Sequence, residues 1–246
     1  MSGHSKWSTI KHKKGAADAK RGKIFTRIGK EITIAAREGG GSPESNARLR
    51  KAVDDAKAAN MPADNIKRAV QRGTGELPGV VYEEVTYEGY GPGGVAIFIE
   101  AMTDNKNRTL PEIRHIFDKN GGNLGASGCV RFMFDKKGYF AVDRGKISEE
   151  KLMEIALEAG ADDLATDDPE SFEIFCSPEA FHNIKSGLEE KGVPITLSEI
   201  TMIPQNPVPL DDAKAQQVIR LMEAIEEHDD VQNVWTAAEL NESQMA

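Results

Sequence analysis

The chain has 246 residues, of which 29% are charged and 39% hydrophobic, and its formal net charge is −9. A hydrophobic share of this size can form packed cores, which excludes a wholly disordered chain. No apolar run approaches the about 18 residues of a membrane-spanning helix, so we expect no membrane partner.

The two cysteines and the first residues indicate the cellular setting. Cys129 and Cys176 stand in apolar runs without a metal-ligand spacing, and the N-terminal residues form no apolar signal core. Both features favour a reduced, cytoplasmic protein that holds no metal.

Charge is divided unevenly along the chain. Residues 1–75 hold 17 Lys and Arg against 7 Asp and Glu, a balance of +10. The remaining residues hold 14 against 33, a balance of −19. A basic end on an acidic body favours a polyanion partner for that end, since the body would repel it. The alternative is that the charge serves solubility alone.

The first 15 residues are predicted to form an arm that becomes ordered on contact with a partner, because they are too poor in apolar side chains to form a core. Trp7 in this arm could stack on a base or equally pack against the protein. The basic and aromatic side chains that we assign to nucleic-acid binding here are Lys6, Trp7, Lys11, His12, Lys13 and Lys14.

Three amphipathic helices are expected to follow. Apolar residues recur at helical spacing over residues 16–38, and the glycines at 39–41 end that helix. A second helix is predicted from Pro43 to Asn60, and a third has Pro62 in its first turn and stops at Gly73. Together they predict a small basic bundle over residues 1–76.

The first of these helices has basic residues opposite its apolar ones, with few acidic neighbours that could pair with them. We therefore expect this face to point to solvent and to position phosphates without reading sequence. A merely solvated face is the alternative. The candidate side chains on this helix are Lys20, Arg21, Lys23, Arg27 and Lys30.

Two strands are predicted at 80–88 and 95–102, joined by a glycine-rich turn at 89–94. The turn matches the G-x-G-x-x-G pattern of dinucleotide sites, but a strand follows it where such a site needs a helix. A hairpin is therefore the favoured interpretation, and no cofactor is expected.

A polar loop is predicted at 104–109, before a helix that buries Ile113, Ile116 and Phe117, and a strand is predicted at 129–134. The loop lies at a strand-to-helix junction, where a helix N-terminus helps to hold an anion. Asn105, Lys106, Asn107 and Arg108 are therefore candidates for a second nucleic-acid contact. Side chains that hydrogen-bond their own backbone are the commoner alternative.

The rest of the chain predicts an α+β fold. Residues 136–204 show the order β-α-β-β-α-β of a ferredoxin-like domain. A proline-rich linker, a helix at 213–227 and a strand at 231–235 follow. Because that helix and strand are too small to fold alone, we expect them to return to the strands after residue 80. This gives a discontinuous middle domain of residues 77–135 and 205–238, into which the ferredoxin-like domain is inserted.

Catalytic patterns are largely missing from the sequence. The five histidines show no metal-ligand pairing, and no Walker loop or nucleophile elbow occurs. We therefore expect no enzyme, no catalytic residue and no small-molecule substrate. Were the chain an enzyme, its best site would be Asp104 with Asn105, Asn107 and Arg108.

Several motifs together resemble the YebC/PmpR family over essentially the whole chain. They occur at residues 3–7, 20–25, 87–94, 104–109 and 121–125, and Lys106 stands where the family more often has Arg. The resemblance implies a cytoplasmic protein of three domains: a helical N-terminal one, a discontinuous middle one, and an inserted ferredoxin-like one.

The resemblance also implies two possible functions. Members are described as DNA-binding transcriptional regulators, and relatives as translation activators that act on the ribosome, including at proline-rich stretches. Both need a basic domain that binds phosphate, on DNA or on ribosomal RNA. A third interpretation, a protein–protein adaptor acting through the acidic ferredoxin-like domain, stays open.

Overall fold

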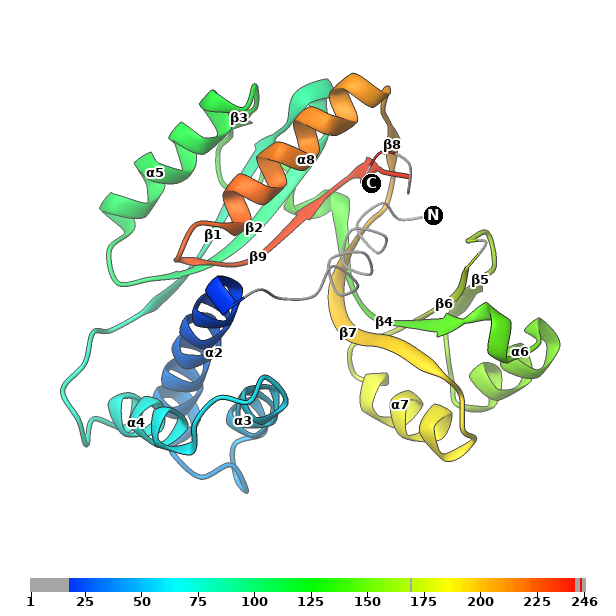
Figure 1. The fold of residues 1–246 in the computed structure, drawn as a ribbon, viewed down its shortest axis with the longest axis horizontal. Coiled ribbons are helices and arrows are strands. Elements are labelled where there is room, and N and C mark those ends of the chain that lie inside the picture. The colour runs from blue at the N-terminus through cyan, green and yellow to red at the C-terminus, as the bar shows by residue number, and fades with distance from the viewer. Residues whose placement is uncertain (1–17, 169, 242–243, 245–246) are drawn as a thin grey trace. The chain divides into compact units, whose positions relative to one another are not determined.

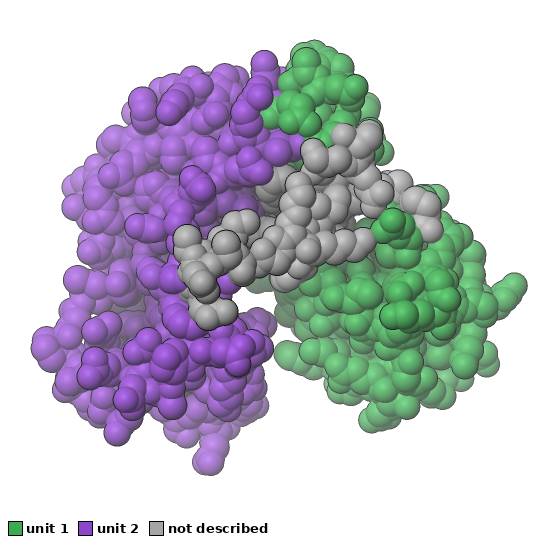
Figure 2. Space-filling model, viewed as in Figure 1, with its two compact units in different colours: residues 1–13, 130–216, 235–246 green, residues 14–129, 217–234 purple. Residues whose placement is uncertain are grey.

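A computed structural model describes residues 18–168, 170–241 and 244 of the chain, with side chains from residue 22 onward within these ranges. The chain divides into two compact units (Figure 2). Unit 2 contains the described residues up to 129 together with 217–234, and unit 1 contains 130–216 and the described residues from 235 onward. Among the described residues, no helix has both the length and the apolar content needed to cross a bilayer.

The first part of unit 2 is a bundle of three helices, as predicted (Figure 1): α2 (Asp18–Gly39), α3 (Ala47–Ala58) and α4 (Ala63–Thr74). Local signals fix their ends. The Asn46 side chain caps α3 by accepting a hydrogen bond from Leu49 N at 3.0 Å. Gly75 ends α4 with a left-handed φ of 83°.

Apolar side chains from all three helices form the core of this bundle: Ile32, Ala35 and Ala36 of α2, Leu49, Ala52, Val53 and Ala56 of α3, and Ala69 of α4. The small side chains let α2 and α4 approach closely. At Gly73 even a methyl group would lie 2.4 Å from the Thr33 carbonyl oxygen, so this position accepts glycine alone without a shift of the helices.

A four-stranded sheet completes unit 2, in the order β3-β1-β2-β9, from β1 (Glu83–Tyr90), β2 (Ala96–Thr103), β3 (Asn123–Leu124) and β9 (Val231–Thr236). β1 and β2 are antiparallel, and a 3-10 turn at Pro92–Gly94 joins them. The glycine-rich segment is therefore a hairpin, as predicted. Residues 80–82, which were expected to belong to the strand, precede it.

Two helices accompany this sheet, α5 (Lys106–Lys119) and α8 (Asp212–Glu226) (Figure 1). The side chains of Phe117 on α5 and Leu221 on α8 both come close to Gly122, just before β3. α5 begins earlier than the sequence predicted. The expected polar loop at 104–109 is mostly the first turn of this helix, because Asn105 caps it.

Unit 1 contains a second four-stranded sheet, built from β4 (Phe134–Asp143), β5 (Asp163–Ala165), β6 (Ser171–Cys176) and β7 (Ile195–Pro204). Its order is β5-β6-β4-β7, and neighbouring strands are antiparallel. Helices α6 (Glu149–Glu158) and α7 (Phe181–Glu190) pack on it through Leu152 and Leu188. This topology confirms the predicted ferredoxin-like fold and the α+β class.

Two local predictions in unit 1 were wrong. Residues 131–133, expected within a strand at 129–134, form a 3-10 turn, and the strand begins at Phe134 and runs on through Gly138. The predicted stiff linker after Pro204 holds a short strand, β8 (Val208–Pro209), which pairs in parallel with β10 (Ala238–Glu239).

Candidate nucleic-acid interface

The basic side chains of α2 that were expected to meet phosphates contact the end of α8 instead. Lys23 Nζ donates to the Glu227 carbonyl oxygen at 2.8 Å, and the Arg27 guanidinium donates to the Glu226 carbonyl oxygen. The last carbonyls of a helix lack intrahelical partners and attract positive charge. Both side chains therefore cap the C-terminus of α8.

Lys30 is buried, with 6% of its surface exposed, which contradicts the prediction that it points to solvent. Its ammonium group lies 2.6 Å from Asp230 Oδ1, 2.9 Å from the Asp229 carbonyl oxygen and 3.1 Å from the Met102 carbonyl oxygen. These three acceptors use all three of its donors. Lys30 therefore has no donor left for a phosphate.

Asp230 is the acceptor at the centre of this contact. Its Oδ2 accepts from Arg108 Nη2 and from the Thr109 hydroxyl, each at 2.8 Å. Burial alone would raise the pKa of Asp230, but the hydrogen bonds from Lys30, Arg108 and Thr109 outweigh it and hold the pKa well below its ordinary range. The carboxylate stays charged and ties α2 to α5 and to the turn before β9.

The remaining predicted side chains of the N-terminal region cannot be placed in this way. Lys20 and Arg21 lie in α2, but their side chains fall outside those that the structure describes. The arm residues fall outside the described residues altogether: Lys6, Trp7, Lys11, His12, Lys13 and Lys14.

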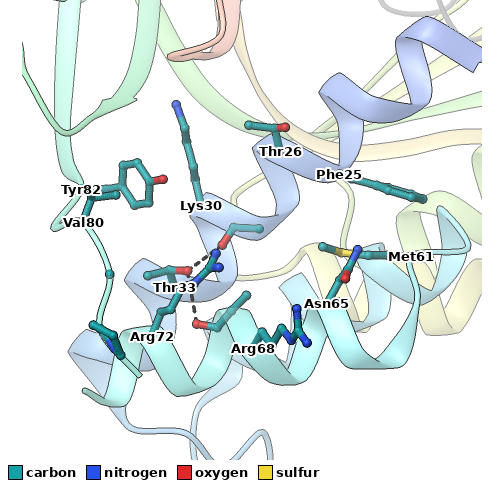
Figure 3. Close-up of a pocket in the computed structure, with 14 residues that line it drawn as sticks. Phe25, Thr26, Lys30, Thr33, Met61, Asn65, Arg68, Arg72, Val80 and Tyr82 are labelled. Carbon is teal, nitrogen blue, oxygen red and sulfur yellow. Dashed lines mark hydrogen bonds between the residues drawn. The ribbon is translucent and has the colours of Figure 1, made fainter. Parts of the chain in front are cut away.

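A cleft of about 550 Å³ opens between α2, α4 and the segment before β1 (Figure 3). We call it the α2–α4 cleft. Its polar lining includes Thr26, Asn65 and Tyr82, and its apolar lining includes Phe25, Met61 and Val80. Lys30, Arg68 and Arg72 supply its charge, and no lining residue carries a carboxylate.

Arg68 and Arg72 are the cations of this cleft that remain available. They stand four residues apart on α4, so they share a face of that helix. Both are exposed, and neither side chain makes an ion pair or hydrogen bond within the part of the chain that the structure describes. Two guanidinium groups without acidic partners favour an anion with several oxygen acceptors.

Sequence reasoning missed these two arginines. The signal was present, since Lys67, Arg68 and Arg72 follow Asp64 in a helix with no other acid. The longer basic row of α2 gave the stronger sequence signal. The cleft itself depends on how α2 and α4 pack and on where residues 78–82 run, which no local pattern specifies.

The segment at 104–108 is held mainly by its own neighbours. The Asn105 side chain accepts from Arg108 N at 3.2 Å, and Lys106 Nζ lies 2.5 Å from Glu83 Oε2. Arg108 also contacts Asp104 Oδ1 at 3.0 Å. The Asn107 side chain is exposed and makes no hydrogen bond within the described chain. A second nucleic-acid contact here stays a prediction, with Asn107 its freest side chain.

The described residues offer little for catalysis. They contain no cluster of three His, Cys, Asp or Glu side chains that would hold a metal ion. The one buried thiol, Cys176, is held in the core of unit 1, where burial raises its pKa to about 11, so it is protonated and unreactive at neutral pH.

Comparisons with known proteins cover almost the whole chain. Residues 5–76 match the family model described as the TACO1/YebC protein N-terminal domain, and residues 82–238 match the one described as the TACO1/YebC second and third domain. A protein of Geobacter sulfurreducens named "probable transcriptional regulatory protein" is 57% identical over 100% of this chain and 98% of its own. One of the same name from Acidobacterium capsulatum is 60% identical over 96% of this chain and 95% of its own.

A solved structure is also similar. The crystal structure of a conserved hypothetical protein from Aquifex aeolicus is 50% identical and superposes with a TM-score of 0.79. The match covers 92% of this chain and 93% of that one.

Proposed function

The chain belongs to the TACO1/YebC family, and we propose that it is a non-enzymatic regulator of gene expression that binds the phosphate backbone of nucleic acid through its N-terminal helical domain. Membership confirms the resemblance inferred from the sequence motifs. The observation that carries the proposal is the α2–α4 cleft, where Arg68 and Arg72 lie exposed and without acidic partners.

Charge supports the same assignment. The net +10 of residues 1–75 attracts a polyanion, whereas the net −19 of the rest of the chain repels it. We therefore assign the main contact to the N-terminal domain. Phosphate contacts from arginine and lysine hold a protein on nucleic acid without specifying sequence. We propose that the protein acts in the cytoplasm, where it would meet its nucleic-acid partner.

The experiment measures binding of the full chain to duplex DNA and to single-stranded RNA over a range of salt concentrations. The test variant is Arg68→Gln/Arg72→Gln. The control, Lys136→Gln/Lys151→Gln, removes the same charge from exposed positions of unit 1. A full-length protein is needed because deleting residues 1–75 would remove Lys30 from Asp230.

The expected result follows from counterion release. Each lost phosphate contact flattens the slope of log K against log salt by about 0.9 on duplex DNA and about 0.7 on single strands. The test variant should therefore lose up to about 1.8 or 1.4 of slope, and the control none. Equal changes in both variants would show that net charge alone matters and would overturn the assignment to the cleft.

We propose transcription as the setting, by analogy with the names of the relatives, and translation on the ribosome as the second candidate. The confinement of positive charge to one end of an acidic chain favours the second, since such a chain can touch RNA at that end. Sedimentation of a lysate through sucrose, with and without RNase, separates them. Co-migration with ribosomes that RNase abolishes would support translation, and a ribosome-free protein with promoter-specific footprints would support transcription.

A further inference from the structure

We propose that the α2–α4 cleft binds one unpaired nucleotide of a single-stranded nucleic acid, with its phosphate on Arg68 and Arg72 and its base against Tyr82. This inference rests on the proposed function and names the form of nucleic acid that the site selects. Its basis is the combination of free charge, an aromatic wall and a concave shape in one place (Figure 3).

The charge of the cleft is concentrated at one wall. Lys30 is already neutralised by Asp230, so the uncompensated positive charge comes from Arg68 and Arg72 on α4. Guanidinium groups bind phosphate oxygens in a bidentate manner. Since no lining residue is acidic, the cleft selects an anion and rejects a cation.

The uncharged lining of the cleft suits a base. Tyr82 is half-buried, and Lys30 Nζ lies 5.3 Å from the centroid of its ring, within the range of a cation–π contact. Phe25, Met61 and the exposed Val80 add apolar surface. A free phosphate would leave this surface unused, whereas a nucleotide uses both parts.

Size and shape favour a single strand over a duplex. The volume of about 550 Å³ lies within the about 300–1,000 Å³ range of small-molecule sites and exceeds what a phosphate group needs. A paired and stacked base cannot enter a cleft unless it is first extruded, which costs free energy that an unpaired base does not lose. The cleft therefore discriminates through the accessibility of the base.

The experiment uses fluorescence anisotropy with the full chain and two probes, a labelled 12-nucleotide single-stranded RNA and a blunt duplex of the same sequence. The test variant is Tyr82→Leu, which removes the aromatic ring and no charge. Tyr82→Phe is the conservative variant, because it keeps the ring. Thermal unfolding of each variant establishes that it is folded.

We expect Tyr82→Leu to weaken single-strand binding about 5- to 150-fold, the range of base–aromatic stacking, with an unchanged salt slope. Duplex binding should not change, and Tyr82→Phe should restore affinity. If Tyr82→Leu unfolds, Val80→Glu takes its place. Val80 is 51% exposed and lies outside regular structure, and the new carboxylate should repel the phosphate and weaken single-strand binding.

Different results would overturn the nucleotide site and the proposed function. Loss of both single-strand and duplex binding by Arg68→Gln/Arg72→Gln, with no effect of Tyr82→Leu, or with an equal loss on both probes from Val80→Glu, would keep the proposed function and overturn the nucleotide site. No effect of the arginine variant on either probe would overturn both. A crosslink from 4-thiouridine RNA to a peptide that contains Tyr82 would support the nucleotide site, and crosslinks confined to unit 1 would contradict it.

Discussion

Lys30 on the first described helix forms a buried ion pair with Asp230, 200 residues later in the chain, with Nζ and Oδ1 2.6 Å apart. The pair connects the N-terminal bundle to the turn before β9. The sequence predicted that Lys30 belongs to a basic binding face, whereas in the structure Lys30 stabilises the fold.

Removing the carboxylate should therefore destabilise the protein. Asp230→Ala leaves Lys30 buried without its partner, which costs about 3–5 kcal/mol of unfolding free energy by analogy with other buried pairs. Asp229→Ala is the matched control, because Asp229 is adjacent and exposed, and should cost under about 1 kcal/mol. Urea unfolding measures both. Equal losses would mean that the ion pair contributes nothing specific.

The same pair sets an acid limit on stability. The pKa of Asp230 is held below its ordinary value in the folded chain, so its contribution is fully present above the unfolded pKa of about 3.9. It is lost as the pH falls below that value toward the folded pKa. The difference in unfolding free energy between wild type and Asp230→Asn should stay constant from pH 7 to pH 5 and shrink below about pH 4.

A different group would give a different pH window. Asp230 N donates to His228 Nδ1 at 3.1 Å, and His228 Nε2 lies 2.9 Å from Glu112 Oε2. If the difference already shrank between pH 7 and pH 5, the assignment to Asp230 would be wrong.

Much of the fold could be predicted because its signals are local. The periodicity of α2, the cap at Asn46 and the glycines after β1 each act within a few residues. The order of elements in unit 1 was enough to predict a ferredoxin-like sheet. The first turn of α5 was mistaken for a loop because its polar residues resemble one, although Asn105 is a typical cap.

The binding site was less predictable because its determinants are distant in sequence. Nothing near Lys30 indicates that Asp230, Asp229 and Met102 will surround it. The absence of acidic neighbours at helical spacing suggested an external anion, whereas the acceptors are carbonyls and a carboxylate from other elements. Arg68 and Arg72 behave in the opposite way to Lys30: the packing of the helices leaves both of them exposed and without an acidic partner.

The close packing of α2 against α4 gives a prediction about the cleft. Gly73→Ala would force a methyl group against the Thr33 carbonyl and Ala36, so we expect a loss of about 1–3 kcal/mol and weaker nucleic-acid binding. Gly22→Ala is the control, since its new methyl group meets nothing within 4 Å, and it should be neutral or stabilising by up to about 1 kcal/mol. Thermal unfolding and binding of the same samples check both. Similar melting temperatures for the two variants would show that the helices separate without cost.

The last prediction separates the two basic faces of the N-terminal bundle. Lys23 and Arg27 donate to the carbonyls at the end of α8, so Lys23→Gln/Arg27→Gln should lower the unfolding free energy, by about 0.5–2 kcal/mol for the lost interactions with the helix terminus. Its salt slope on duplex DNA should stay within about 0.5 of wild type, because both side chains already bond to carbonyls at the end of α8.

Arg68→Gln/Arg72→Gln should show the opposite behaviour. These side chains make no ion pair within the described chain, so their loss should leave stability within about 0.5 kcal/mol of wild type. The salt slope should flatten by up to about 1.8. Urea unfolding gives the unfolding free energy of each variant, and a salt series of binding isotherms gives its salt slope. Together the four values test whether phosphate binds to α4 and not to α2. A flattened slope in the α2 variant together with an unchanged slope in the α4 variant would return the interface to the face that the sequence first suggested.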